Sequence, residues 1–335
     1  MRVFVPAPFR YKGVDYPYGY QDLPDALGDV LLAGNLIRAT TPAASASASI
    51  PGVVGSSTAL WFPFTTDRGQ DRLVDRSVNL ALTNGGTALT FAGASPMVTF
   101  NGNGYLQADQ TVMTLIQRSI FRLDTLAADE MFVMWCDITH PTTFAAGQAS
   151  LFYWGKNATQ GWGISYTGTT GRLMFDHVSQ SGNRQQFTFD PNFQLAIDGV
   201  NTRTALCLTI SRANVDCGGI GKGNGLFEIE VSKRGITNQG PFTQRNFTRV
   251  TPERVPNIGV APCKFDSVVG LTIGARPTTG LATNADNMPA GYGLNSIGFA
   301  RRKRQCAFPL VVTRQLTRLI ALGQAQNTMP AACAN

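Results

Sequence analysis

The stretch "SLFYWGKNATQGWGISYTGTTGRLMFDHVS", residues 150–179, carries the strongest indication of the fold. Apolar and polar residues alternate along three short runs, and Gly, Asn and Thr separate one run from the next. A period of two is the periodicity of a β-strand, in which successive side chains point to opposite faces of a sheet. Short alternating runs with frequent turn residues are typical of antiparallel hairpins in a sandwich or barrel.

The same pattern continues through most of the chain after residue 58. Further strands are predicted at "ALWFPF" (59–64), "MFVMWCDIT" (131–139), "TALCLTISR" (204–212), "GLFEIEVSKR" (225–234), "VVGLTIGAR" (268–276) and "GLNSIGFARR" (293–302). A helix is predicted only near the end, where Thr313 is a candidate N-cap, Leu316, Leu319 and Ile320 share one face, and Gly323 ends the pattern. We therefore expect an all-β domain over residues 59–323, followed by a C-terminal tail at 324–335.

Composition agrees with this expectation. The chain has 335 residues, of which 43% are hydrophobic and only 15% charged, and it contains 35 Gly and 18 Pro. No segment approaches the roughly twenty apolar residues of a membrane span, so we expect no membrane insertion. The N-terminus lacks the apolar run of a secretory signal, which predicts synthesis and assembly in a cytoplasm.

Metal sites and cofactors are not expected. The chain has six Cys without any C-x-x-C spacing and only two His, His140 and His177. Buried, reduced thiols are the ordinary state of cysteine in a cytoplasm. The formal charge of +7 includes a dense basic cluster at 301–304, "RRKR". We interpret this cluster as a solvated turn or an interface rim and expect no specific nucleic-acid partner, because stacking aromatics and further basic residues would have to share its face.

Residues 1–39 form a separate small module. A short strand is predicted on each side of a Lys12-Gly13 turn, and a helix with Pro24 in its first turn is predicted to end at Gly34. Such a module is too small to be stable alone, so we expect another protein to cover its apolar side. The candidate anchoring residues are Phe9, Tyr11, Tyr16, Leu23, Leu27, Val30 and Leu31. Residues 40–58 are almost entirely Ala, Ser, Thr, Pro and Gly, which predicts a flexible linker.

Two resemblances extend this interpretation. The order of "LWFPF" (60–64), "DRLVDRSVNLALTNGGTALTFAG" (71–93) and "MVTFNGNGYLQA" (97–108) resembles the opening of laminin-G/concanavalin-A-like domains. The hairpins of 150–177 and the ending "LTIGAR" to "LTRLIALG" are similar to the middle and end of those domains. This resemblance implies a jelly-roll sandwich of two antiparallel sheets, a fold that hosts lectins, glucanases and structural modules alike.

The opening segment "FRYKGVDYPYGYQDLPDALGDVLLAGNLI", residues 9–37, is similar to short segments of tailed-bacteriophage virion proteins. That resemblance implies a non-enzymatic virion protein that decorates or projects from the capsid or tail. Its expected partners are the major capsid or tail proteins of the same particle, and its expected location is the virion, assembled in the cytoplasm of the host bacterium. Identical copies on a particle usually form closed, symmetric assemblies, so we expect a trimer or a dimer.

Recognition of a host glycan is the alternative function, since lectin-like sites combine aromatic platforms with Asn, Asp and Gly loops. The candidate contacts lie in "YWGKNATQGWG" and "TNADN": Tyr153, Trp154, Asn157, Trp162, Asn284, Asp286 and Asn287. The insert at 276–294 that contains "TNADN" is either a binding loop or a subunit contact. A host surface polysaccharide would then be a further partner.

Catalysis ranks third. Glu228 and Glu230 lie two apart on a predicted strand, but the three-acid pattern typical of glucanases with this fold is incomplete in "FEIEVSKR". Retaining hydrolysis needs two carboxyl groups about 5–5.5 Å apart, and residues two apart on a strand are separated by about 6.5–7 Å at the backbone. We therefore expect no enzymatic activity and no catalytic residues.

Overall fold

The computed structural model describes residues 2–5, 8–16, 19–22, 27, 31, 38–39, 58–64, 80–90, 98–141, 147–157, 160–167, 171–178, 184–188, 203–212, 227–236, 248–249, 253–255, 270–279, 283–304, 308–321, 330 and 333. The chain separates into two compact units, Met1–Gly52 and Val53–Asn335. The second unit contains two large sheets, and every strand pairing in the described part of the chain is antiparallel.

The first large sheet has eight described strands. Its order is β17 (Thr248–Arg249), β16 (Phe227–Ile236), β15 (Arg203–Arg212), β10 (Glu130–Thr139), β22 (Gly293–Lys303) and β6 (Thr58–Pro63). Two short strands complete it, since β18 (Glu253–Val255) pairs with β16 and β8 (Val98–Thr99) pairs with β22. The long central strands β10, β15 and β22 come from segments far apart in the sequence, so this sheet depends on long-range pairing.

The second large sheet has seven described strands. Its order is β14 (Arg184–Thr188), β13 (Arg172–Val178), β12 (Gln160–Thr167), β11 (Gln148–Asn157), β19 (Gly270–Ile273), β9 (Gly104–Asp109) and β7 (Thr83–Gly86). The three alternating runs of 150–179 form β11, β12 and β13, which are consecutive neighbours in this sheet. A further hairpin, β20 (Arg276–Thr279) and β21 (Thr283–Ala285), lies within the predicted insert, and β20 contacts β11.

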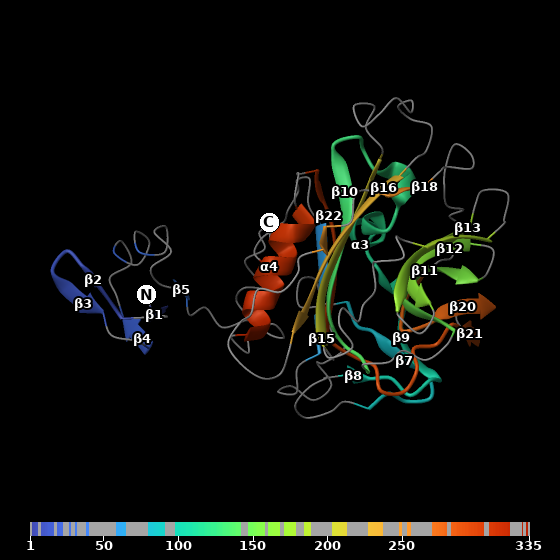
Figure 1. The fold of residues 1–335 in the computed structure, drawn as a ribbon, viewed down its shortest axis with the longest axis horizontal. Coiled ribbons are helices and arrows are strands. Elements are labelled where there is room, and N and C mark those ends of the chain that lie inside the picture. Colours follow the sequence, from blue (N-terminus) through green and yellow to red (C-terminus); the bar gives the residue numbers. More distant parts are fainter. Residues whose placement is uncertain are drawn as a thin grey trace. The chain divides into compact units, whose positions relative to one another are not determined.

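The two sheets lie face to face (Figure 1). Buried aromatic side chains from both sheets fill the space between them. Phe132 and Phe299 from the eight-stranded sheet meet Phe152 and Trp162 from the seven-stranded sheet, with Phe132 and Trp162 edge to face at 4.9 Å between ring centroids. Offset and edge-to-face rings add stabilisation beyond the apolar area that they bury. The predicted all-β sandwich of two antiparallel sheets is therefore confirmed.

Short helical segments connect β9 to β10. They are η2 (Gln110–Val112), α3 (Leu115–Ile120) and η3 (Leu123–Thr125). Thr114 caps α3: its hydroxyl accepts from the amide of Gln117, whose side chain accepts from the amide of Thr114. This reciprocal capping box satisfies two amide groups that a helix start leaves without partners. Ile120 and Phe121 at the end of α3 are buried in the aromatic core.

The C-terminal helix α4 (Phe308–Ala321) covers the opposite face of the eight-stranded sheet (Figure 1). Phe308, Val312, Leu316 and Ile320 pack against Trp135 and neighbouring residues of that face. The helix begins five residues before the predicted cap, so the prediction of Thr313 as N-cap is wrong. Thr313 lies inside the helix, where its hydroxyl donates to the carbonyl of Pro309 at 2.7 Å. No helix in the described part of the chain is both long enough and apolar enough to span a bilayer.

The N-terminal unit has its own strands. The predicted hairpin is confirmed: β2 (Phe9–Tyr11) pairs with β3 (Val14–Tyr16), and Lys12 and Gly13 form the turn with positive φ values of 49° and 81°. The unit also contains a three-stranded sheet that was not predicted, in the order β4 (Gly19–Asp22), β1 (Arg2–Val5) and β5 (Arg38–Ala39). Within the predicted helix, Leu27 and Leu31 have helical backbone, and Tyr16 and Leu31 are buried.

The other anchoring predictions remain predictions. Tyr11 is half-buried, the side chain of Phe9 is outside the described residues, and Leu23 and Val30 lie outside them altogether. Almost all of the predicted linker at 40–58 also lies outside the described residues. In the predicted tail at 324–335, only Pro330 and Cys333 are described. The domain boundaries at 39, 58 and 323 are likewise predictions.

We expect a truncated protein that begins at Val53 to fold as the intact chain does. In the described residues no strand of the N-terminal unit pairs with a strand of the sandwich, so removal of the first unit breaks no ladder hydrogen bond of the second. Thermal unfolding followed by circular dichroism should therefore give a midpoint within about 2 °C of the full-length value, which corresponds to less than 1 kcal/mol in a domain of this size. A truncated protein that is insoluble or melts much earlier would contradict the independence of the two units.

Candidate functional site

The aromatic residues proposed as glycan contacts lie in the interior. Trp154 and Trp162 belong to the core between the sheets, where Trp154 stacks on Phe121 with 4.8 Å between ring centroids. The indole N–H of Trp162 donates to the backbone carbonyl of Phe121 at 2.9 Å. Tyr153 is also buried, and its hydroxyl donates to the carbonyl of Gln160 at 3.1 Å. None of the three rings offers a solvent-facing surface on which a sugar could stack.

A polar cluster occupies the outer face of the seven-stranded sheet, which is the face turned away from the eight-stranded sheet. Phe175 and Ile164 point into the core, so their neighbours Asp176 and Ser165 point outward. Asp176 on β13 is only 2% exposed and binds Arg184 of β14 through both carboxylate oxygens, with a distance of 2.9 Å from Arg184 Nε to Asp176 Oδ1. Buried carboxylates require such partners, because an unpaired charge inside a protein is strongly destabilising.

The loop after β21 adds a second acid to this cluster. Asp286 Oδ2 accepts from Arg184 Nη2 at 3.2 Å and from Arg276 Nε at 2.8 Å. The backbone of Asp286 has a left-handed φ of 54°, and its carbonyl accepts from the amide of Ser150 on β11 at 2.8 Å. Asp and Asn are the residues that adopt this conformation most readily after glycine. We refer to Asp176, Arg184, Arg276 and Asp286 as the acid–arginine array.

Two glutamines extend the array toward solvent. Gln186 of β14 is exposed, and its Nε2 donates to Gln148 Oε1 of β11 at 2.8 Å. Gln148 Nε2 in turn lies 3.1 Å from Ser165 Oγ and 3.4 Å from Asp176 Oδ2. Amide, hydroxyl, carboxylate and guanidinium groups from five strands and one loop thus converge on one face. These are the donors and acceptors that can bind sugar hydroxyls.

The electrostatic surroundings of Arg184 favour the charged form of its guanidinium group. Burial acts to lower the pKa of Arg184, but the neighbouring carboxylates of Asp176 and Asp286 oppose it, and the net shift is upward. Both carboxylates of the array are bound by arginine, so each is held in place by a charge-assisted hydrogen bond.

The two histidines are buried elsewhere in the sandwich. Burial lowers the pKa of His177 to about 4, with an opposing contribution from the charge of Asp176, and burial also lowers the pKa of His140. His140 Nδ1 lies 2.9 Å from the carbonyl of Pro141, and Nε2 lies 2.8 Å from the hydroxyl of Thr204. Both rings are therefore structural groups of the interior, neutral near pH 7.

We expect acid to destabilise the fold through His177. The unfolded chain binds the proton with a pKa near 6.5, whereas the folded chain resists it until about pH 4. Stability from this residue is therefore complete above pH 6.5 and is lost as the pH falls toward 4, by about 3 kcal/mol in total. Urea unfolding at several pH values should show this loss in the wild type. The variant His177→Gln should lose less stability over the same window, and equal slopes would contradict the prediction.

The other predicted contacts are only partly described. Asn157 ends β11 opposite Gln160, and Asn284 lies in β21 opposite Pro277, but their side chains are outside the described set. Asn287 is half-buried next to Asp286, and its Oδ1 accepts no hydrogen bond from the described residues. Among the predicted residues, Asp286 is the one that the structure places in the array, and glycan contact by Asn157, Asn284 and Asn287 stays a prediction.

The basic cluster at 301–304 is tied into the fold. Arg301 Nε donates to Glu130 Oε2 at 2.9 Å, and Lys303 Nζ lies 2.5 Å from Asp129 Oδ2. Arg302 is buried on the face covered by α4. Two of the four basic residues of the cluster, Arg301 and Lys303, are therefore held in ion pairs at the end of β22.

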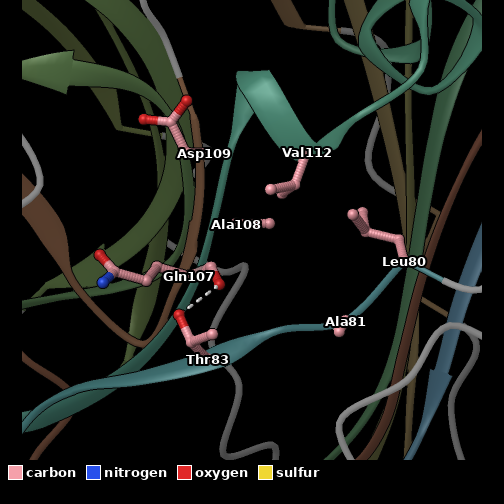
Figure 2. Close-up of a pocket in the computed structure, with 7 residues that line it drawn as sticks. All are labelled: Leu80, Ala81, Thr83, Gln107, Ala108, Asp109 and Val112. Atoms are coloured by element: carbon pink, nitrogen blue, oxygen red, sulfur yellow. Dashed lines mark hydrogen bonds between the residues drawn. The ribbon is translucent and has the colours of Figure 1, made fainter.

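A concavity lies near the other edge of the seven-stranded sheet, away from the array (Figure 2). It has a volume of about 380 Å³, and the apolar side chains of Leu80 and Val112 face each other across it above Ala81 and Ala108. Asp109, also on its wall, accepts from the amide of Thr111 and so caps η2. Thr83 and Gln107 line the rest of the wall, where the hydroxyl of Thr83 donates to the backbone carbonyl of Gln107 at 3.3 Å.

Sequence reasoning missed most of the array. Asp176, Arg184 and Arg276 are ordinary charged residues in alternating strands, and nothing local marks them as partners. Arg184 and Asp286 are 102 residues apart in the chain.

The described residues contain no group of three or more His, Cys, Asp or Glu side chains that could share a metal ion. Cys136, Cys207 and Cys333 are buried free thiols.

Comparisons with known proteins were made by sequence and by structure. No protein-family model and no curated protein sequence matches the chain. A crystal structure of a receptor binding domain is similar with a TM-score of 0.41 and 12% identity over 74% of this chain and 46% of that one. The botulinum neurotoxin serotype C1 binding domain gives a TM-score of 0.40 and 14% identity over 74% of this chain and 47% of that one.

The binding domain of botulinum neurotoxin DC in complex with SialylT is also similar, with a TM-score of 0.39 and 11% identity over 74% and 47% of the two chains. This chain spans about half the length of these structures. With TM-scores below 0.5, the similarities carry no argument about ligands. Neither they nor the described structure bears on the resemblance to bacteriophage virion proteins, which stays a prediction.

Proposed function

We propose that the sandwich is a non-catalytic carbohydrate-recognition domain and that its binding site is the outer face around the acid–arginine array. The observation that supports this proposal is the convergence of Asp176, Arg184 and Asp286 with the amides of Gln148 and Gln186. Arg184 remains 28% exposed and Gln186 is exposed, so part of this hydrogen-bonding surface is open to a ligand.

A rigid site supports the same proposal. Four of the strands that carry these groups are consecutive neighbours in the sheet, and Asp286 is held by a backbone hydrogen bond to Ser150 as well as by two arginines. Preorganised polar groups bind a sugar without the entropy cost of ordering them first.

The test is binding of the full-length protein to an array of glycans, followed by titration calorimetry with the glycan that binds best. The variant Gln186→Ala should weaken binding by roughly tenfold, which is the loss of about one good hydrogen bond. Gln315→Ala makes the same substitution on α4, on the opposite side of the eight-stranded sheet, and should leave binding unchanged. Equal effects of the two variants, or no glycan binding at all, would refute the site.

The absence of catalysis is part of the proposal. Incubation of the protein with a bound polysaccharide should release no reducing ends above the rate of a heat-denatured sample. Release that depends on Glu228 or Glu230 would instead favour a glycosidase. Both residues lie on β16, in register with Ser211 and Thr209 of β15.

The location in a virion is a separate proposal, supported by the resemblance of residues 9–37 alone. In that proposal the N-terminal module docks on a capsid or tail protein and the sandwich binds a polysaccharide of the host surface. Deleting residues 1–39 should then remove the protein from purified particles while leaving glycan binding intact. Light scattering of the full-length protein tests the expected trimer or dimer.

A further inference from the structure

The array is electrically balanced, and this balance bears on the class of ligand. It contains two carboxylates, Asp176 and Asp286, and two guanidinium groups, Arg184 and Arg276, so its formal charges cancel. The inference that follows rests on the proposed function, because it concerns the ligand of the same site.

Both arginines already bind carboxylates. Arg184 uses Nε and Nη2 for Asp176 and shares Nη2 with Asp286, while Arg276 uses Nε for Asp286. An acidic sugar is ordinarily held by an arginine fork that matches its carboxylate with two parallel hydrogen bonds. The Nε–Nη2 edge of Arg184 can take an incoming carboxylate or sulfate only if the nearly buried Asp176 is displaced. An anion bound elsewhere on this guanidinium would lie close to Asp176 and Asp286, which carry like charge.

The segments that connect the strands of the site, 142–146, 158–159, 168–170, 179–183 and 280–282, contain no Lys or Arg. The segment after β14, 189–202, contains two Asp and no basic residue. Lys156 lies on β11, and its side chain is outside the described residues. Arg172 points to the same side of β13 as Asp176, but four residues of strand place it about 13 Å away at the backbone. That separation exceeds the screening length of physiological salt. The charge of +7 must therefore arise mainly from other parts of the chain.

The groups with free capacity are neutral. The amides of Gln148 and Gln186 can each donate and accept, which suits the hydroxyl groups of an uncharged sugar. The carboxylate of Asp286, which is 18% exposed, can also accept from a sugar hydroxyl. We infer that this site selects neutral, hydroxyl-rich saccharides over glycans that carry a carboxylate or a sulfate.

The experiment compares neutral oligosaccharides with their sialylated and sulfated counterparts on the same core, using the full-length protein. We expect the neutral member of each pair to bind at least about tenfold more tightly. Its affinity should change less than about twofold between 50 and 500 mM salt, because no net charge is neutralised on binding.

The variant Asp286→Asn tests the physical reason. Asparagine tolerates the left-handed backbone of this position, so the loop is preserved while one negative charge is removed. The array then carries an excess positive charge, and preference should move toward the acidic glycan by about tenfold relative to the wild type. Gln315→Ala should leave the preference unchanged.

Three outcomes are distinguishable. Tighter binding of acidic glycans by the wild type would overturn the inference on selectivity while leaving glycan recognition intact. An unchanged preference in Asp286→Asn would show that the charge balance of the array does not set it. No binding to any glycan would overturn both this inference and the proposed function.

Discussion

We expect the substitution Trp162→Ala to lower the free energy of unfolding by about 4 kcal/mol. Trp162 is fully buried, and its ring lies edge to face against Phe132 and Phe152. Alanine would leave a large cavity between the sheets and would remove the indole donor from the carbonyl of Phe121, which keeps the amide of Leu123. Native domains are stable by only about 5–15 kcal/mol, so the loss is severe.

Urea unfolding followed by far-ultraviolet circular dichroism measures this effect without relying on tryptophan emission. The variant Trp162→Phe keeps an aromatic ring in the core and removes the indole donor, so it should cost much less, about 1–2 kcal/mol. A Trp162→Ala protein that retained wild-type stability and lost only glycan binding would place this ring in a binding site rather than in the core.

The second large effect is expected from Arg184→Met. This change removes the guanidinium that pairs with Asp176, a carboxylate with a side chain only 2% exposed, and that also reaches Asp286. Removing one partner of a buried ion pair leaves an uncompensated charge, and we expect a loss of about 2–4 kcal/mol in stability. Glycan binding should fall with it, because the array loses its central donor.

The ion pair of Arg203 and Asp137 in the eight-stranded sheet provides a control that distinguishes an effect on stability from an effect on glycan binding. Arg203 donates to Asp137 at 2.7 Å, and Asp137 is fully buried in β10. Arg203→Met should therefore destabilise the fold by a similar amount and leave glycan affinity unchanged at temperatures where the variant is folded. Adding Asp176→Asn to Arg184→Met should recover part of the lost stability, since no buried charge remains to be compensated. Parallel losses of binding in both arginine variants would indicate a general effect of destabilisation.

The sheet architecture could be predicted because its signal is local. The alternation in 150–179 reflects one core-facing and one outward-facing side of each strand, and β11, β12 and β13 follow it closely. The Lys12-Gly13 turn could also be predicted, because a two-residue hairpin loop needs positive φ values, which glycine adopts readily. The start of α4 was not, because Thr313 has the chemistry of a cap although its hydroxyl bonds within the helix.

The roles of the aromatic residues could not be settled in this way. Alternation predicts that Tyr153 and Trp154 point to opposite faces, and it identifies neither face as exposed. Both rings are buried, because Trp154 lies between the sheets and the outer face near Tyr153 is close to the β20–β21 hairpin, which contacts β11. That hairpin comes from the insert at 276–294, more than a hundred residues further along the chain.

By itself, the sequence determined the fold class, the hairpins and a terminal helix, because period, turn chemistry and capping act over a few residues. The tertiary structure alone decided the partners of each charge. Asp176, Arg184 and Asp286 meet because β14 pairs with β13 and because the backbone of Asp286 is bonded to Ser150 on β11. An ion pair between residues 102 positions apart depends on the packing of whole strands, and no local pattern records it.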